Sequence, residues 1–331
     1  MKILNFNWAA LDVRGGVKYA IGVAIVIALS LVIEFSWMAV GMSALLAWLI
    51  NVPGPRRDRL NGIVIFTVVG AALIGLVWAL AGTYRPWLIS MVAVAFLGTF
   101  AMIRGPRGFM LGWCLICLFY VAPLFGTAEI PLEVLSAHLL GSIVILILVA
   151  LPFGEAAAAE GESEEAASAE KPNVSFVASY AATVAIVMTI GLVLGDLWLK
   201  SDPTLILQAS LMIILPSARG TWVVAVDRML GLIAGIVAGF YLGQLAGGQI
   251  MEIIVWISAS FMVVTLMNVN AGAVIFFFVL PYSLVWGMLG GEAGHAIANE
   301  RIAAELIGVV LAGIAVSMRE VLARKFGKQP Q

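Results

Sequence analysis

The residues best suited to chemistry are charged side chains that interrupt long apolar stretches. Asp58 and Arg59 begin one such stretch, in the order DRLNG, and Asp227 and Arg228 begin another, in the order DRMLG, about half a chain later. A charge within a membrane span costs about 3 kcal/mol on insertion scales, so each instance needs a reason. The two arginines could attract an anionic substrate. Alternatively, they could anchor the helices at the membrane interface, with each acidic residue stabilising a helix N-terminus.

A histidine and a glutamate form a second pair of candidates, because an internal repeat places them at equivalent positions. His138 and Glu305 both fall within apolar spans. A histidine exchanges protons near neutral pH, and a buried carboxylate can do the same, so either could carry a proton during transport. The alternative for His138 is a hydrogen-bonded interior side chain. Glu305 follows Arg301 by one helical turn, so these two could pair within their own helix without any transport role.

The composition defines the class of protein that must position these residues. The mean hydropathy is +1.08, and 63% of residues are apolar while only 11% are charged, against roughly 25% charged in soluble domains. Apolar runs of about 20 residues, long enough to cross a hydrocarbon core, recur along the chain. We therefore predict an all-α, polytopic membrane protein. No basic stretch is long enough to bind nucleic acid, and the alternating pattern of a membrane β-barrel is absent.

Twelve membrane spans are predicted. They cover residues 17–34, 36–51, 60–82, 86–103, 108–126, 131–152, 176–198, 202–217, 222–246, 250–268, 270–289 and 296–319. With both termini in the cytoplasm, most Lys and Arg residues lie on the cytoplasmic side, and only Arg85, Lys200 and Arg301 face outward. This bias predicts a multi-pass membrane protein with both termini on the cytoplasmic side.

A polar segment between the sixth and seventh spans divides the chain. Residues 153–174 consist largely of Ala, Glu, Ser and Gly. Too few apolar residues are present to form a core, so we expect an acidic cytoplasmic linker. The predicted domains are a first six-helix repeat at 1–152 and a second at 175–331.

Similar sequences in the two halves indicate a duplication. Residues 23–37 align without a gap with residues 184–198, the DRxxG elements follow in the third and ninth spans, and Ala-x-Leu-x-Gly occurs at 137–141 and less strictly at 304–308. Because each half has an even number of spans, both should insert in the same sense. The halves should then be related by an axis along the membrane normal, with substrate handled near their interface.

A series of small residues predicts close helix packing in the ninth span. Glycine recurs at every fourth position of this span: Gly231, Gly235, Gly239 and Gly243. Such a small-xxx-small face allows another helix to approach closely. Packing is therefore the favoured role of these glycines.

Sequence motifs of enzymes are not found. Cys114 and Cys117 lie in one apolar span with no second ligand pair, so we interpret them as small apolar residues one turn apart. No phosphate-binding Gly-rich loop with Lys-Ser/Thr occurs, and no nucleophile–base pair or metal ligand set emerges. We expect neither a cofactor nor a metal ion, and we expect no enzymatic activity.

These motifs resemble a known family. An Arg-x-x-Gly at the start of a Gly-rich third helix, present twice, and the closing helix RIAAELIG at 301–308 are similar to the fusaric-acid-resistance-like (FUSC) and aromatic acid exporter superfamily. The opening Arg14-x-x-x-Lys18, followed by an apolar span, is also similar to that family. The resemblance implies inner-membrane efflux of aromatic carboxylates, drugs or related anions, with a periplasmic membrane-fusion adaptor as partner. The chain departs from larger members, which carry a sizeable cytoplasmic domain between the halves, and His138 replaces the expected glutamate-like position.

The leading hypothesis is thus a proton-coupled exporter of small organic anions, with Arg59, Arg228 and Arg301 binding substrate and His138 and Glu305 carrying protons. A second hypothesis is an anion channel, since plant malate channels resemble the same superfamily. A third is a membrane scaffold for envelope assembly that transports nothing. A homodimer is compatible with each of the three hypotheses.

Overall fold

The computed structural model describes residues 6–33, 37–51, 55–80, 83–125, 131–151, 173–199 and 204–325. Helices are the only regular elements among them, which confirms the all-α prediction. Except for its last two residues, the predicted linker at 153–174 lies outside the described residues.

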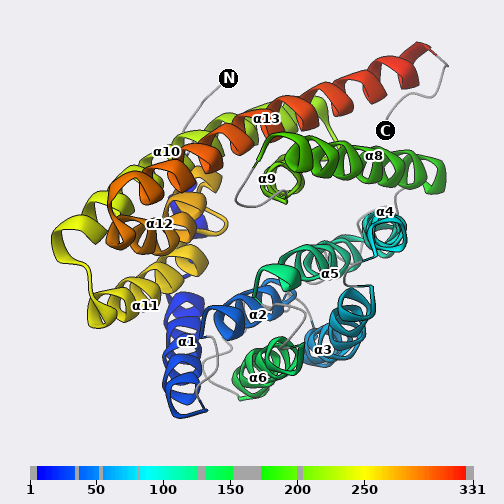
Figure 1. Cartoon of the computed structure of the whole chain (residues 1–331). Coiled ribbons are helices and arrows are strands. Elements are labelled where there is room, and N and C mark those ends of the chain that lie inside the picture. The colour runs from blue at the N-terminus through cyan, green and yellow to red at the C-terminus, as the bar shows by residue number, and fades with distance from the viewer. Residues whose placement is uncertain are drawn as a thin grey trace. The chain divides into compact units, whose positions relative to one another are not determined.

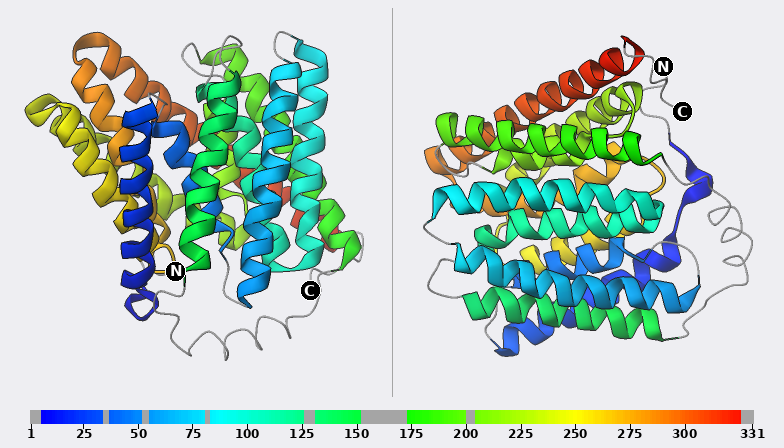
Figure 2. Two further views of the ribbon diagram at one scale, coloured as in Figure 1. Left: turned by 90° about the horizontal axis from the view of Figure 1, so that it is seen from below. Right: turned by 90° about the vertical axis from the view of Figure 1, so that its right-hand side faces the viewer.

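Twelve α-helices are labelled in Figure 1 and seen from two further sides in Figure 2. They are α1 (Val13–Ile33), α2 (Trp37–Leu49), α3 (Arg56–Ala79), α4 (Tyr84–Phe100), α5 (Pro106–Phe125), α6 (Pro131–Ala150), α8 (Val174–Trp198), α9 (Leu205–Ile213), α10 (Ala218–Ala246), α11 (Gln249–Leu266), α12 (Ala271–Leu289) and α13 (Gly291–Lys325). Each corresponds to one of the twelve predicted spans.

Not all of these helices can cross a membrane. Nine helices within the described ranges are long and apolar enough to do so, which confirms a multi-pass membrane protein. Helix α2 has 13 residues and α9 has 9. At 1.5 Å per residue, α9 extends only about 14 Å through a hydrocarbon core of about 30 Å. The predicted span at 202–217 is therefore too long.

A proline explains why α9 is short. The residue before a proline disfavours helical backbone, and Leu215 precedes Pro216. Ile214 is already extended, with φ −64° and ψ 118°. Helix α10 then begins at Ala218, where the hydroxyl of Ser217 accepts a hydrogen bond of 3.1 Å from the Gly220 backbone N–H. Hydropathy alone could not locate this helix end, because the apolar run at residues 211–215 continues past it.

The helices form two compact units, which are described separately. The early unit comprises Gly22–Ile186, and the late unit comprises Met1–Ile21 together with Val187–Gln331. Helices α1 and α8 each contribute residues to both units. These units describe packing within the fold. The repeat boundaries at 1–152 and 175–331 stay a prediction.

In the early unit, α6 packs against α2 and α3, while α5 packs against α3 and α4. Glycines lie at the closest approaches. A Cβ atom on Gly112 of α5 would collide with the backbone of Gly98 in α4. A Cβ atom on Gly141 of α6 would press on the backbone of Val40 and Ala44 in α2. Backbone-to-backbone contact of this kind is what small residues allow in membrane helices.

The late unit repeats this arrangement of helix pairs. Helix α13 packs against α9 and α10, and α12 packs against α10 and α11. Gly308 of α13 meets the backbone of Ile206 and Ser210 in α9, as Gly141 meets α2 in the early unit. This correspondence supports the duplication, which itself stays a prediction.

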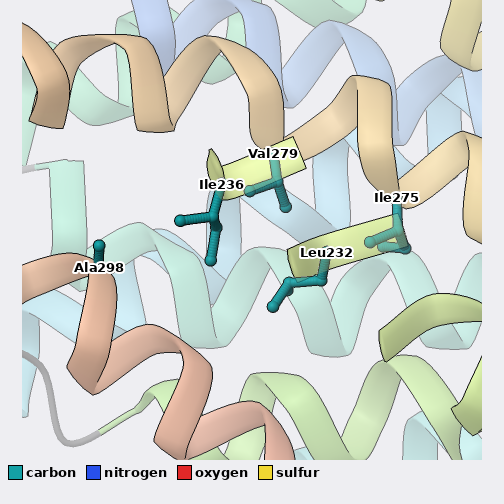
Figure 3. Packing of buried hydrophobic residues seen from close by; sticks show 5 residues of the cluster. All are labelled: Leu232, Ile236, Ile275, Val279 and Ala298. Carbon is teal, nitrogen blue, oxygen red and sulfur yellow. The ribbon is translucent and has the colours of Figure 1, made fainter. Parts of the chain in front are cut away.

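The glycine series of α10 lies directly against α12. Added Cβ atoms on α10 would collide with α12 carbonyl oxygens in four pairs: Gly231 with Gly272, Gly235 with Phe276, Gly239 with Leu280 and Gly243 with Leu284. Both series advance together by four residues, so α10 and α12 run parallel, and the predicted packing role is confirmed. Figure 3 shows buried side chains of this region, with Leu232 and Ile236 from α10, Ile275 and Val279 from α12, and Ala298 from α13.

We predict that Gly231→Ala destabilises the protein by about 1–3 kcal/mol, because a backbone carbonyl cannot move aside as a flexible side chain can. The matched control is Gly75→Ala in α3, where a Cβ atom meets nothing within 4 Å. This control should be neutral or stabilising by up to about 1 kcal/mol, since Ala favours helix more than Gly. Thermal unfolding in detergent measures both, and equal stability of the two variants would contradict the packing role.

Candidate functional site

Five side chains of the late unit form a polar cluster: Gln208, Arg228, Tyr282, Arg301 and Glu305. The Arg301 guanidinium donates a hydrogen bond to the Gln208 amide oxygen. The Glu305 carboxylate interacts electrostatically with Arg301 and with Arg228, and the Tyr282 hydroxyl interacts with Arg301. The cluster therefore draws on α9, α10, α12 and α13, which no single sequence motif connects.

The charged members lie well inside their helices. Helix α10 begins at Ala218, so Asp227 and Arg228 do not open the span as predicted but follow more than two helical turns. Arg301 lies equally far inside α13, which begins at Gly291. By contrast α3 begins at Arg56, so the DR element of the early unit does stand in a first turn. The two DR elements thus occupy different places in their helices.

Arg301 is held by a short chain of hydrogen bonds to α9. Its Nη1 atom lies 3.3 Å from Oε1 of Gln208. Nε2 of the same amide donates to the Thr204 hydroxyl oxygen at 2.8 Å, one helical turn earlier. Both ends of the amide are therefore used, and this orients the amide oxygen toward the guanidinium.

Glu305 is enclosed but has no direct polar partner in the described part of the chain. Its exposed fraction is 3%, and its carboxylate accepts no hydrogen bond from a described residue. The expected pairing of Arg301 with Glu305 within α13 is not formed, because the guanidinium is directed to Gln208 instead. The carboxylate is influenced by two cations without touching either one.

Two aromatic rings pack against the Tyr282 ring of the cluster. The Tyr282 ring packs edge-on against Trp256, with centroids 5.0 Å apart, and contacts Phe278 at 5.6 Å. The Tyr282 hydroxyl is buried, and no described residue makes a hydrogen bond to it. Tyr19 of α1 interacts with it electrostatically. A buried donor beside a guanidinium, lined by rings, suits an organic anion with an apolar body.

The DR element of the early unit forms an ion pair across helices. The Asp58 carboxylate lies 2.5 Å from Nη1 of Arg107, joining the first turns of α3 and α5. The two side chains are 49% and 38% exposed, respectively, so water screens the pair and its net contribution is small. This geometry favours anchoring as the role of Asp58. Arg59 beside it is partly buried.

His138 is fully enclosed in the early unit. Its Nε2 atom lies 3.1 Å from the Thr67 backbone carbonyl of α3, and its ring packs edge-on against Phe66 at 5.1 Å. Gly70 leaves the space that the ring occupies. No described residue bonds to Nδ1. This environment agrees with a hydrogen-bonded interior side chain, and the proton-carrying role of His138 stays a prediction.

The structure thus brings together Arg228, Arg301 and Glu305, while Asp58, Arg59 and His138 lie in the early unit. Sequence analysis did not predict Gln208 as a member. One signal was available, because Thr204 and Gln208 are polar residues spaced by one turn in an otherwise apolar segment. In the sequence, Tyr282 is simply one residue of an aromatic stretch. Nothing near it in the sequence indicates that its hydroxyl interacts with Arg301.

Residues 184–315, which contain the whole polar cluster, match the model of the family described as fusaric acid resistance protein-like. The resemblance to the FUSC-like family is therefore confirmed over this segment. Together with the many apolar helices, this match fits a membrane transport role for the chain. The curated proteins and the solved structures contain no match to the chain.

Proposed function

We propose that the protein is a secondary transporter of the bacterial inner membrane that exports small organic anions, aromatic carboxylates or drug-like anions, and that Glu305 binds and releases a proton during transport. The observation that carries this proposal is the gathering of Arg228, Arg301 and Glu305 well inside apolar helices of the late unit. Charges at such a depth cost about 3 kcal/mol each on insertion scales and are typical of substrate and proton pathways. The family match supports transport as the class of activity.

The two arginines are suited to binding a carboxylate. A guanidinium presents its donors in a planar fork that matches both oxygens of a carboxylate group. Among described residues Arg301 donates one hydrogen bond, to Gln208, so further donors of its fork can face a ligand. The Tyr282 hydroxyl supplies another donor, and the rings of Trp256 and Phe278 supply apolar surface. Arg59 stays a candidate for attracting anions at the membrane interface.

Glu305 can link proton binding to anion binding. When ionised, its carboxylate competes with a substrate carboxylate for the same two cations. Protonation removes that competition, so a bound proton should strengthen anion binding, and a bound anion should strengthen proton binding to the same extent. The arrangement therefore predicts that lower pH raises anion affinity through this residue.

An anion channel is the alternative that the same charges support. A membrane potential negative inside moves an anion outward with about 2.3 kcal/mol per charge for each 100 mV. Two guanidinium groups against one carboxylate could lower the barrier for that passage. In a channel, Glu305 would set the affinity for anions, and no proton would cross with them. Measuring proton flux during anion efflux distinguishes the two.

Further features complete the proposal. Both termini are assigned to the cytoplasm from the distribution of Lys and Arg. A periplasmic membrane-fusion adaptor is proposed from the family resemblance, and a homodimeric assembly is proposed as compatible with transport. Co-purification with a candidate adaptor and the mass of the detergent-solubilised protein test these two features.

Replacing Arg228 or Arg301 by Gln should raise the apparent KM for export of an aromatic carboxylate by about 10–100-fold, because each variant removes a hydrogen bond to a charged group worth about 1.5–3 kcal/mol. Export from proteoliposomes at low salt measures this. Arg324→Gln is the matched control, since that side chain is 74% exposed in the last turn of α13. An unchanged KM in both cluster variants would refute the proposed site.

Replacing Glu305 by Gln should abolish the dependence of anion affinity on pH, because an amide does not titrate and carries no negative charge that would compete with the substrate carboxylate. His138→Ala is measured beside it. A pH dependence lost only in the Glu305 variant assigns proton exchange to that residue, and loss in both variants assigns it to both residues. If the anion affinity of the Glu305 variant depends on pH as it does in the parent, proton binding at Glu305 during transport is refuted.

A further inference from the structure

The spacing of Arg301 and Glu305 should by itself produce an ion pair. Opposite charges four residues apart on a helix lie on the same face and attract each other. In the late unit this pair is not formed, because Nη1 of Arg301 lies 3.3 Å from Oε1 of Gln208 on another helix. The Arg301 guanidinium is therefore bound by the neutral amide of Gln208 and not by the carboxylate of Glu305.

The Gln208 amide is fixed for this contact. Its Nε2 atom donates to the Thr204 hydroxyl at 2.8 Å, so its oxygen must point the other way, toward Arg301. Helix α9 also contacts α13 two residues further along, where the Ser210 hydroxyl lies 3.3 Å from the Gly308 carbonyl oxygen. A Cβ atom on Gly308 would collide with the backbone of α9, so the two helices are in close contact there. The amide oxygen is thus presented to α13 by a rigid support.

We infer that Gln208 is a positioning residue that keeps Arg301 from pairing with Glu305 and so keeps the anion site open, an inference that rests on the proposed function. In an Arg301–Glu305 ion pair, the carboxylate would occupy the guanidinium donors that a substrate needs. Gln208 occupies one donor and adds no negative charge. Thr204 acts through Gln208 by orienting its amide. This role also explains why an amide stands in a nine-residue helix that is otherwise mostly buried and apolar.

The test measures export of benzoate, the simplest aromatic carboxylate, from proteoliposomes. Gln208→Leu should raise the apparent KM about five-fold or more with little change in maximal rate, because Arg301 turns to Glu305. Combining Gln208→Leu with Glu305→Gln should return the KM to that of Glu305→Gln alone, since no carboxylate is left to capture the guanidinium. Thr204→Val should raise the KM less than Gln208→Leu does. The control is Arg324→Gln, which changes an exposed side chain in the last turn of α13 and should leave the KM unchanged.

A second readout decides the inference without any transport. The coupling between Arg301 and Glu305 is measured by thermal unfolding of a double-mutant cycle, once in the parent and once in the Gln208→Leu background. The inference predicts a larger favourable coupling in that background. Equal coupling in both, or a KM that Gln208→Leu leaves unchanged while the parent exports benzoate, would overturn the role of Gln208 alone. If the folded parent exports no organic anion, the proposed function is overturned. If Gln208→Leu nevertheless increases the coupling between Arg301 and Glu305, the positioning of Arg301 by Gln208 stays supported.

Discussion

A charge inside a hydrocarbon core must find opposite charge or polar partners nearby, and this constraint shapes the late unit. Arg228, Arg301 and Glu305 would each be unfavourable alone, at about 3 kcal/mol on insertion scales. When the three groups lie close together, their opposite charges stabilise one another, although Arg301 and Glu305 form no direct ion pair. The gathering requires helices that approach closely, and the glycine series of α10 and Gly308 of α13 allow this contact. Backbone packing and electrostatics are therefore two parts of one arrangement.

The early unit meets the same constraint differently. The predicted repeat aligns Glu305 with His138. The imidazole of His138 can be uncharged, and its Nε2 atom lies 3.1 Å from the Thr67 backbone carbonyl oxygen. The alignment places buried Val134 at the position of Arg301. The ion pair of Asp58 stands at the start of α3, where both partners are partly exposed. At the positions aligned with Arg301 and Glu305, the described part of the early unit therefore holds Val134 and His138 and no pair of opposite charges.

Much of the fold follows from local sequence, and most of the site does not. Apolar runs located every helix to within several residues, because burial in lipid acts on each span separately. The early end of α9 was missed because the apolar run continues from Ile213 through Leu215, up to Pro216. Spacing along α13 predicted that Arg301 meets Glu305, yet the hydrogen bond goes to Gln208 across the helix interface. Contacts between helices depend on the angle and register of packing, which one sequence does not encode in any short pattern.

The central claim is that an organic anion binds in the late unit at the polar cluster, with its carboxylate on Arg301. An experimental structure determined with 4-bromobenzoate tests it directly, since the bromine atom identifies the ligand by anomalous scattering. The account predicts a bromine peak beside the Tyr282 and Trp256 rings and carboxylate density in contact with the Arg301 guanidinium. Ligand bound only elsewhere, with Arg301 paired to Glu305, would contradict it.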